Sequence, residues 1–490
     1  MSEGSGRGGG LEDSGVAASI ESAFRQLRTE LRIREGFPPG VLEEAERVAK
    51  ERIPGASASH ADRTAIEFVT IDPPGSRDLD QAVQLERERD GYRVRYAIAD
   101  VGFWVDRGSP IEREAWLRGV TFYAPDHREA LYPPVLSAGV ASLLPNQACP
   151  AVMFDFLLDA SGELSSWKVE RSLVRSRAQL TYTQLLEHCA GSVTESEPWA
   201  ETLTLLGEIG PKRLALEARR GGVSLPIRDQ HVQRSAAQEL GYELVYERPT
   251  EAESWNAQIS LLTGHAAATL MLEAGIGLLR TMPPFMERDL EKLRRIAKTL
   301  GFSWPGDLSY PAFMHAVDLA NPHIEVLVRQ ARRVMRGADY IAFSGEPPEQ
   351  PLHGALAMPY AHATAPLRRL ADRYVLDLLV TLSSPGRPSD AEISTLLQLP
   401  AVMDEADRKT SAMERRVIDI AEARVLSSRI GDVVEAVVVD LRGREAEVQV
   451  EDPPVRAMVK FAGSQPPELG QRVELKVLAD EGEMGAVLVA

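Results

Sequence analysis

The stretch FVTIDPPGSRDLDQA, residues 68–82, decides the fold expected of this chain. An apolar run rich in β-branched residues ends at Asp72, and two more aspartates, Asp78 and Asp80, complete a span of nine residues. The run predicts a buried strand, and the Pro-Pro-Gly that follows it predicts a sharp turn. Such a turn can bring three carboxylates to one point, where their oxygens suit a magnesium ion. An acidic surface turn in which Asp80 serves as a cap is the alternative from spacing alone.

Alternation of apolar and polar residues continues on both sides of this stretch and predicts a large sheet. The alternating segments are AIEFVTID (65–72), YRVRYAIADVGFWV (92–105), PAVMFDFLLD (150–159) and SSWKVERSLVRS (165–176). Helical periodicity dominates later in the chain, at residues 211–220, 255–275, 288–300, 367–382 and 406–426. Strands followed by helices favour an α+β fold.

Both ends of the chain predict smaller units. Residues 1–14 are mostly glycine, serine and acidic residues, a composition typical of disorder. Residues 15–60 predict a small helical domain, either a helix-turn-helix that touches nucleic acid through its arginines or a packing appendage. Residues 61–427 are then the main domain, and five short strands in residues 428–490 predict a small OB-type barrel.

The composition is that of an ordinary globular protein, with 44% hydrophobic and 26% charged residues. No segment resembles a signal peptide, and no apolar run reaches the ~18 residues that a membrane helix needs. Cys149 and Cys189 are too few for a disulfide framework. We therefore expect a cytoplasmic protein with no membrane partner. The formal net charge of −17 argues against a nucleic-acid partner, although a channel responds to its own lining.

A second motif, PYAHATAPLRRLADRYVLDLL at residues 359–379, combines a histidine, a threonine and two arginines at the start of a predicted helix. Backbone N–H groups at a helix N-terminus favour anions, and a guanidinium can bind phosphate through two donors. Candidates for phosphate contacts are therefore His362, Thr364, Arg368 and Arg369. Solvated arginines at an ordinary helix start are the alternative.

Together the two motifs resemble those of the RNase II and RNase R family of exoribonucleases. The pattern D-x5-D-x-D after a strand and the pattern H-x-T-x-P-L-R-R at a helix start match its catalytic domain. RGVTFYAPD (118–126), AQLTYTQL (178–185) and SAMERR (411–416) match in the same order. The resemblance covers about residues 64–426 and implies an RNB-type α+β domain with a large mixed sheet, followed by an S1-like barrel.

The resemblance implies magnesium-dependent hydrolysis of single-stranded RNA from its 3′ end to nucleoside 5′-monophosphates. Asp72, Asp78 and Asp80 would hold the metal, and Asp80 would also take part in orienting the attacking water. Arg368 would stabilise charge on the phosphate. Glu414 would position the terminal nucleotide; a plain glutamate on a helix face is its alternative. Manganese is an alternative ion.

Three further positions would contact RNA. Tyr123 matches an aromatic residue that stacks on the terminal base, and Tyr182 matches a tyrosine associated with a preference for RNA over DNA. Leu225 stands where a second aromatic residue usually completes the clamp around the base. Both tyrosines could instead be core residues.

The sequence departs from the family pattern at Gln81, where a further aspartate is usual. The amide oxygen of Gln81 can still ligate magnesium but supplies no charge, so metal affinity should fall unless a nearby carboxylate such as Asp100 compensates. A short helical region also replaces the usual two cold-shock barrels. The segment from Gly431 has twelve acidic and six basic residues, with Phe461 as its only aromatic residue. We expect a barrel of weak RNA affinity and a channel open enough for structured RNA with a 3′ overhang.

Two other functions are compatible with these patterns: an inactive RNA-binding regulator with a degenerate metal site, and a metal-dependent phosphohydrolase of small nucleotides. The resemblance suggests a monomer. Local groups of basic residues would line its RNA channel, namely Arg171, Arg175, Arg177, Lys212, Arg213, Arg219, Arg220, Arg329, Arg332, Arg333 and Arg336.

Overall fold

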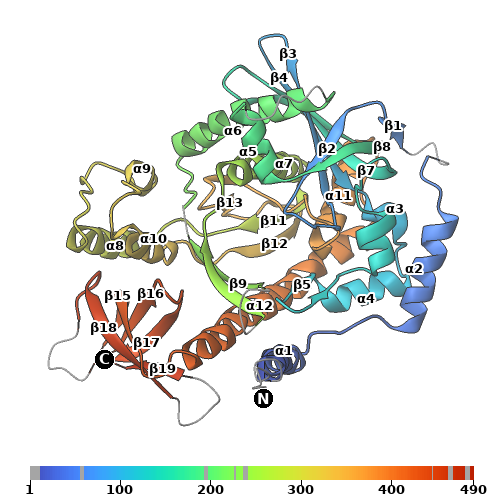
Figure 1. Ribbon diagram of the computed structural model, residues 1–490. Coiled ribbons are helices and arrows are strands. Elements are labelled where there is room, and N and C mark those ends of the chain that lie inside the picture. The colour runs from blue at the N-terminus through green and yellow to red at the C-terminus, as the bar shows by residue number, and fades with distance from the viewer. Residues whose placement is uncertain are drawn as a thin grey trace, which may run out of the picture.

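The computed structural model describes residues 12–55, 60–191, 197–225, 228–235, 241–443, 445–461, 467–479 and 486–489. Its centre is a mixed six-stranded sheet in the order β1-β8-β2-β3-β4-β7 (Figure 1). The strands are β1 (Ala61–Asp62), β2 (Phe68–Ile71), β3 (Gln81–Glu88), β4 (Gly91–Ala99), β7 (Ala148–Leu158) and β8 (Leu164–Leu180).

The long strand β8 closes this sheet on itself. Its first part pairs antiparallel with β7, and its last five residues pair parallel with β2. Because one strand thus serves both edges, the sheet curls into a barrel, and large side chains such as Tyr96, Phe154 and Phe156 fill its core at 1% exposure or less. The buried β2 delivers the acidic turn to one end of this barrel.

A short helix interrupts the second alternating segment. Alternation predicts a strand through Val105, but β4 ends at Ala99, because the Asp100 carboxylate accepts a hydrogen bond from the Phe103 N–H (3.2 Å) and caps α3 (Val101–Trp104). Between α3 and Cys189 the other elements outside the sheet are α4 (Pro110–Arg118), β5 (Phe122–Tyr123), β6 (Arg128–Glu129), a π-helical turn (Leu136–Val140) and α5 (Tyr182–Cys189).

Four long helices pack around the closed sheet. The helix α6 (Ala200–Arg220) lies against β3 and α7 (Glu251–Ala274), and α11 (Leu370–Leu382) lies against α7 and α12 (Asp390–Ser427). Gly264 in α7 lets the chain before α11 approach closely: its carbonyl accepts the Ala361 N–H (3.0 Å), and a Cβ there would lie 2.1 Å from the Tyr360 ring. No helix among the described residues is long and apolar enough to cross a membrane.

Smaller elements join these helices to the rest of the chain. They are β9 (Asp229–Arg234), β10 (Tyr242–Glu247), β11 (Ile276–Thr281), α8 (Glu287–Thr299), α9 (Tyr310–Ala316), α10 (Ile324–Arg332), β12 (Asp339–Ser344), β13 (Leu352–His353) and β14 (Met358–Pro359).

The two N-terminal helices pack on different parts of the main domain. The helix α1 (Glu12–Glu30) lies against α12, and α2 (Pro39–Glu51) lies against α4 (Figure 1). A helix-turn-helix instead packs its two helices on each other, so the arrangement favours the packing appendage. The disorder expected for residues 1–14 falls mostly on residues outside the described ones.

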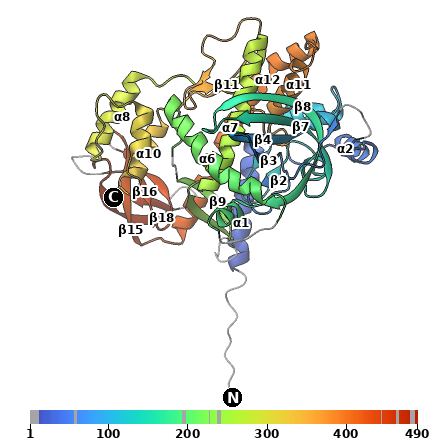
Figure 2. The same ribbon diagram turned by 90° about the horizontal axis from the view of Figure 1, so that it is seen from above.

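The chain ends in a five-stranded antiparallel sheet in the order β17-β16-β15-β18-β19. Contacts between β17 and β19 curl this sheet as well, and it lies beside α10 and α8 (Figure 2). The α+β class with a C-terminal barrel is thereby confirmed. Its strands are β15 (Val433–Arg442), β16 (Glu445–Val450), β17 (Arg456–Lys460), β18 (Arg472–Ala479) and β19 (Ala486–Val489).

Many basic residues expected to line a channel instead form contacts inside the structure. Arg171 pairs with Asp100 (2.8 Å) and Asp377 (2.5 Å). Arg333, the residue directly after α10, pairs with Asp440 of β15 (2.5 Å). Acidic partners from distant segments thus already neutralise these two arginines. Ion pairs also join Arg177 to Glu67, Arg329 to Glu447 and Arg332 to Asp229, and Lys212 pairs with Glu208 one turn earlier on the same helix. That these residues line an RNA channel stays a prediction.

Candidate active site

Backbone hydrogen bonds hold two of the three aspartates of the acidic turn at fixed points. Asp72 directly follows β2, and its N–H donates to the Leu180 carbonyl (3.0 Å). Asp80 directly precedes β3, and its carbonyl accepts the Ala99 N–H (2.9 Å). Asp78 lies in the turn between them. The sheet therefore fixes both ends of the turn.

Asp80 joins the acidic turn to the second motif. Its side chain is 4% exposed, Oδ1 accepts the Leu367 N–H (2.7 Å), and Oδ2 lies 3.5 Å from Nε of Arg368. Burial raises the pKa of Asp80 to about 8, while Arg368 opposes the rise and the charge of Asp78 adds to it. The two motifs thus meet at one buried carboxylate.

Asp72 carries an unpaired buried oxygen. Burial raises the pKa of its carboxyl to about 6, with Arg368 opposing and Asp78 contributing to the rise. Its Oδ2 atom is buried and has no hydrogen-bond partner. Buried polar atoms are nearly always paired, so this carboxylate oxygen, on a residue that also experiences the charge of Asp78, suits a cation as its missing partner.

Asp78 is held by a hairpin made of β5 and β6. Tyr123 donates its hydroxyl hydrogen to Oδ2 (3.0 Å), and Nη1 of Arg128 lies 2.6 Å from Oδ1. Tyr123 and Arg128 are direct partners across the hairpin. Tyr123 is 51% exposed, so its ring remains accessible although its hydroxyl is engaged. No local sequence pattern indicated Arg128, because its partner lies fifty residues earlier.

The paired arginines before α11 have different surroundings. Arg368 has a half-exposed side chain that faces Asp80. Arg369 turns to Asp372, to which its Nε and Nη2 donate at 3.0 and 2.8 Å. Asp372 is fully buried and also accepts the Ala365 N–H (2.7 Å). Arg369 therefore stabilises the loop rather than standing free for a phosphate. The sequence analysis did not predict a role for Asp372. Its position three residues after Arg369, on the same face of a helix start, is the signal that could have indicated the ion pair.

Gln81 occupies the position of the missing fourth aspartate and ties β3 to the second motif. Its amide donates to the Thr364 carbonyl, a bond that a carboxylate could not form because it has no hydrogen to donate. His362 lies in the same loop and contacts the Tyr340 hydroxyl through Nδ1 (2.6 Å). Burial lowers the pKa of His362 well below its ordinary value. His362 and Thr364 thus support the loop.

Asp100 does not compensate for Gln81, contrary to expectation. Its carboxylate pairs with His60 (3.1 Å) and Arg171 (2.8 Å) and caps α3. These partners neutralise its charge within a separate buried cluster, so it is not available to a metal ion at the acidic turn.

The remaining predicted residues fall into different surroundings. Tyr182 begins α5 near Asp72, and burial and the charge of Asp72 raise the pKa of its hydroxyl. Leu225 packs against the apolar cluster formed by α8, α9 and α10. Glu414 lies on α12, where the neighbouring charges are those of Arg332 and Asp229. Tyr182 therefore joins the site, whereas contacts of Leu225 and Glu414 with RNA stay predictions.

The oxygen donors at the turn fit a magnesium ion chemically, but arginines hold two of the carboxylates. Within the described part of the chain, no group of three or more histidine, cysteine, aspartate or glutamate side chains stands ready to bind a metal. Asp78 is paired with Arg128 and Asp80 faces Arg368. Metal binding would therefore require these side chains to rearrange.

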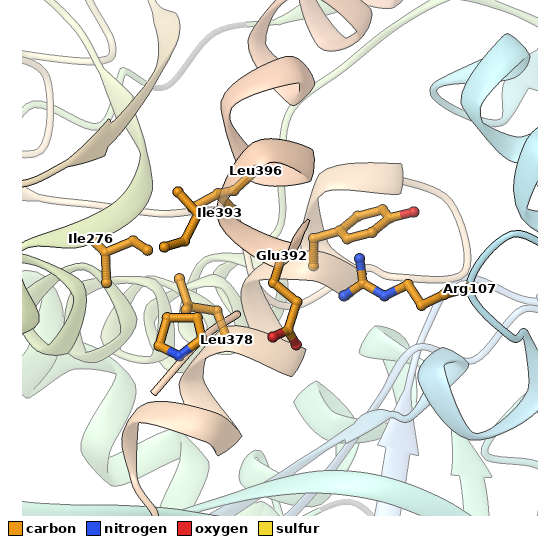
Figure 3. A pocket seen from close by; sticks show the side chains of 8 residues that line it. Arg107, Ile276, Leu378, Glu392, Ile393 and Leu396 are labelled. Atoms are coloured by element: carbon orange, nitrogen blue, oxygen red, sulfur yellow. The ribbon is translucent and has the colours of Figure 1, made fainter. Parts of the chain in front are cut away.

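A pocket between the start of α12 and the end of α11 lies apart from these residues (Figure 3). None of the candidate site residues lines it, so we do not assign it to the substrate. Its lining consists of Arg107, Ile276, Tyr374, Leu378, Pro388, Glu392, Ile393 and Leu396.

Comparison with known proteins identifies two matching families. The model of the RNB domain matches residues 61–384, and the model of the RNase II-type exonuclease C-terminal S1 domain matches residues 432–481. Ribonuclease R of Aquifex aeolicus is 28% identical over 446 residues, which cover 87% of this chain. The chain spans 61% of the length of that relative.

Two solved structures show how widely the fold is shared. Mycoplasma genitalium RNase R, in complex with ribose methylated single-stranded RNA, matches with a TM-score of 0.86 at 19% identity, covering 96% of this chain and 78% of its own. Yeast Ssd1, described as a pseudonuclease, matches with a TM-score of 0.65 at 15% identity, covering 82% and 50%. The fold alone therefore does not decide between an enzyme and an inactive relative.

The raised pKa values predict how stability depends on pH without metal. Below pH ~4 the folded and unfolded chains both hold these protons. Above it only the folded chain keeps them, on Asp72 up to about pH 6 and on Asp80 up to about pH 8. The stability contributed by Asp72 and Asp80 is therefore lost as pH rises through about 6 and then about 8. Asp80→Asn keeps an uncharged side chain, so its melting temperature in chelator should rise relative to wild type as pH increases.

Differential scanning calorimetry from about pH 5 to about pH 9 measures this difference. Asp90→Asn, at an exposed aspartate in the turn between β3 and β4, is the matched control and should run parallel to wild type. Parallel curves for Asp80→Asn and wild type would show that Asp80 does not titrate in this range.

Proposed function

The chain belongs to the RNB-domain family, and from this premise we propose that it is a magnesium-dependent 3′-to-5′ exoribonuclease. Its proposed substrate is the 3′ end of single-stranded RNA, and its proposed products are nucleoside 5′-monophosphates. The observation that carries the proposal is that the acidic turn contacts two distant segments, Asp78 through Tyr123 and Asp80 through Arg368, while the charges of Asp78 and Arg368 act on Asp72. A carboxylate cluster, a half-exposed guanidinium and an accessible aromatic ring are what hydrolysis of a polynucleotide end requires.

The three aspartates would hold the metal ion. The unpaired Oδ2 of Asp72 and the raised pKa values of Asp72 and Asp80 support this role, because burial disfavours the charged carboxylates and a bound cation would offset that cost. A bound magnesium ion supplies a nucleophilic water and stabilises charge on the phosphate. Manganese prefers the same oxygen ligands and is the alternative ion.

The other site residues would bind and orient the RNA. Arg368 has one side toward Asp80 and the other toward solvent, which places its guanidinium for contact with phosphate oxygens. The Tyr123 ring would stack on the terminal base, a contact that any base can make. Tyr182, near Asp72, would contact the ribose, where a 2′-hydroxyl distinguishes RNA from DNA.

Two alternative functions stay open to experiment. Gln81 favours an inactive RNA-binding regulator. The hydrogen bond from the Gln81 amide to the Thr364 carbonyl is, however, a structural reason for a glutamine at this position. A phosphohydrolase of small nucleotides would have little use for the exposed ring of Tyr123. The cytoplasmic location and the monomeric state stay predictions.

Asp80→Asn should abolish shortening of RNA from the 3′ end while RNA still binds. Loss of a group that only orients a metal ligand already costs about 10- to 100-fold, so we expect at least a 100-fold loss here. Gel analysis of 5′-labelled single-stranded RNA with magnesium measures the ladder, with Asp90→Asn as the control. Wild type that binds RNA without cutting it would favour the regulator, and cleavage of free nucleotides alone would favour the phosphohydrolase.

Tyr123→Ala should weaken RNA binding about 5- to 150-fold, since stacking on one base contributes about 1–3 kcal/mol. Tyr123→Phe removes only the hydrogen bond to Asp78 and should retain most of the affinity. Fluorescence anisotropy with labelled single-stranded RNA in chelator measures both variants without cleavage. If Tyr123→Phe loses as much affinity as Tyr123→Ala, the hydroxyl rather than the ring is responsible.

Duplex RNA with a 3′ overhang should also be degraded past the start of the duplex. Mycoplasma genitalium RNase R, which shares this fold, has been solved in complex with double-stranded RNA, and this supports the expectation. Time courses on an overhang substrate and a blunt duplex measure this property. Stalling at every duplex edge would contradict it.

A further inference from the structure

The β5–β6 hairpin spans the distance between α1 and the acidic turn. On one side, Tyr123 and Arg128 contact Asp78. At the turn of the hairpin, Asp126 accepts two hydrogen bonds from Nη1 of Arg28 in α1, each 2.8 Å long. The N-terminal helix and the candidate active site are therefore connected through eight residues of chain, 122–129.

The contact between α1 and the hairpin is buried on both sides. The Arg28 side chain is 7% exposed and that of Asp126 is 9% exposed. Removing one partner of a buried ion pair leaves the other charge uncompensated, so the pair holds its geometry firmly. A second contact lies just beyond α1, where the Gly36 N–H donates to the Glu129 carboxylate (3.1 Å).

The hairpin has little stability of its own. Each of its strands has only two residues, and an isolated two-stranded hairpin is marginal in water even when longer. Its turn is otherwise held by Arg234, whose guanidinium donates to the carbonyls of Pro125 (3.3 Å) and Asp126 (3.0 Å). The position of Tyr123 therefore depends on contacts made from outside the hairpin.

The helix α1 is itself fixed to the main domain. Glu30 near its end pairs with Arg416 of α12 (2.6 Å). Phe24 packs edge to face on Tyr242 of β10 (5.7 Å between ring centroids), and the Tyr242 hydroxyl donates to Glu21 (3.1 Å). A support that is anchored at several points can hold the hairpin in one place.

From this arrangement we propose that α1 belongs to the RNA-binding apparatus and that Arg28 is a positioning residue, which fixes Tyr123 through Asp126. The inference rests on the proposed function, in which Tyr123 stacks on the terminal base. Arg28 itself touches no RNA. Arg28 lowers the free-energy cost of ordering the hairpin on RNA binding, because the Tyr123 ring already occupies its RNA-binding position in the free protein.

Anisotropy with labelled single-stranded RNA in chelator tests this role through a double-mutant cycle. Arg28→Ala should weaken binding about tenfold, and by no more than Tyr123→Ala does, because it acts through that ring. In the Tyr123→Ala background, Arg28→Ala should change the affinity less than about twofold. Arg25→Ala removes an exposed arginine three residues earlier on the same helix and should bind like wild type.

Arg28→Lys keeps the charge but not the guanidinium geometry and should lie between wild type and Arg28→Ala, which keeps the test usable if the alanine variant folds poorly. A lowered melting temperature with unchanged RNA affinity would reduce Arg28 to a structural residue and overturn the inference. Equal losses in both backgrounds would also overturn it. Wild type that neither binds nor cleaves RNA would instead overturn the proposed function, on which the inference rests.

Discussion

The buried carboxylate of Asp80 is the contact on which the arrangement of the candidate site depends. It accepts the Leu367 N–H and faces Arg368, residues almost three hundred positions later in the chain. The neighbouring Gln81 makes a second link to the same loop through the Thr364 carbonyl. These contacts fix the start of β3 against the loop before α11, so the acidic turn and the arginine stand together. The pKa of Asp80 rises to about 8 because this position buries its carboxylate.

Two of the three carboxylates at the site are paired with arginines rather than free. Arg128 neutralises Asp78 and Arg368 faces Asp80, while Asp72 keeps an oxygen without a partner. A carboxylate that is paired with a guanidinium gains less from binding a metal ion. Both arginines therefore reduce the negative charge that would attract a metal ion to the site. Arg128 reaches the site from the same hairpin as Tyr123, which couples the charge balance to the ring proposed to stack on RNA.

The surplus of negative charge does not exclude a nucleic-acid partner. We expected local groups of basic residues along an RNA channel to offset it, but several of these residues form ion pairs within the protein. Arg329 of α10 pairs with Glu447 of the C-terminal barrel, and Arg333, which follows α10, pairs with Asp440. Acidic residues of the barrel are thus used to attach it to the main domain. Cations near the acidic turn come instead from the hairpin and from the loop before α11.

The sequence by itself determined the fold class, the order of most strands and helices, the acidic turn and the motif before α11. Those features are encoded in neighbouring residues, as alternation in β2 and β8 or as the aspartates that follow an apolar run. Only the tertiary structure decided which charged groups serve the site. Arg368 and Arg369 are adjacent, yet one faces Asp80 and the other is bound to Asp372. Asp100 is held by His60 and Arg171, and Arg128 reaches Asp78. Each of these pairings depends on the distance between segments far apart in the chain, which no local pattern specifies.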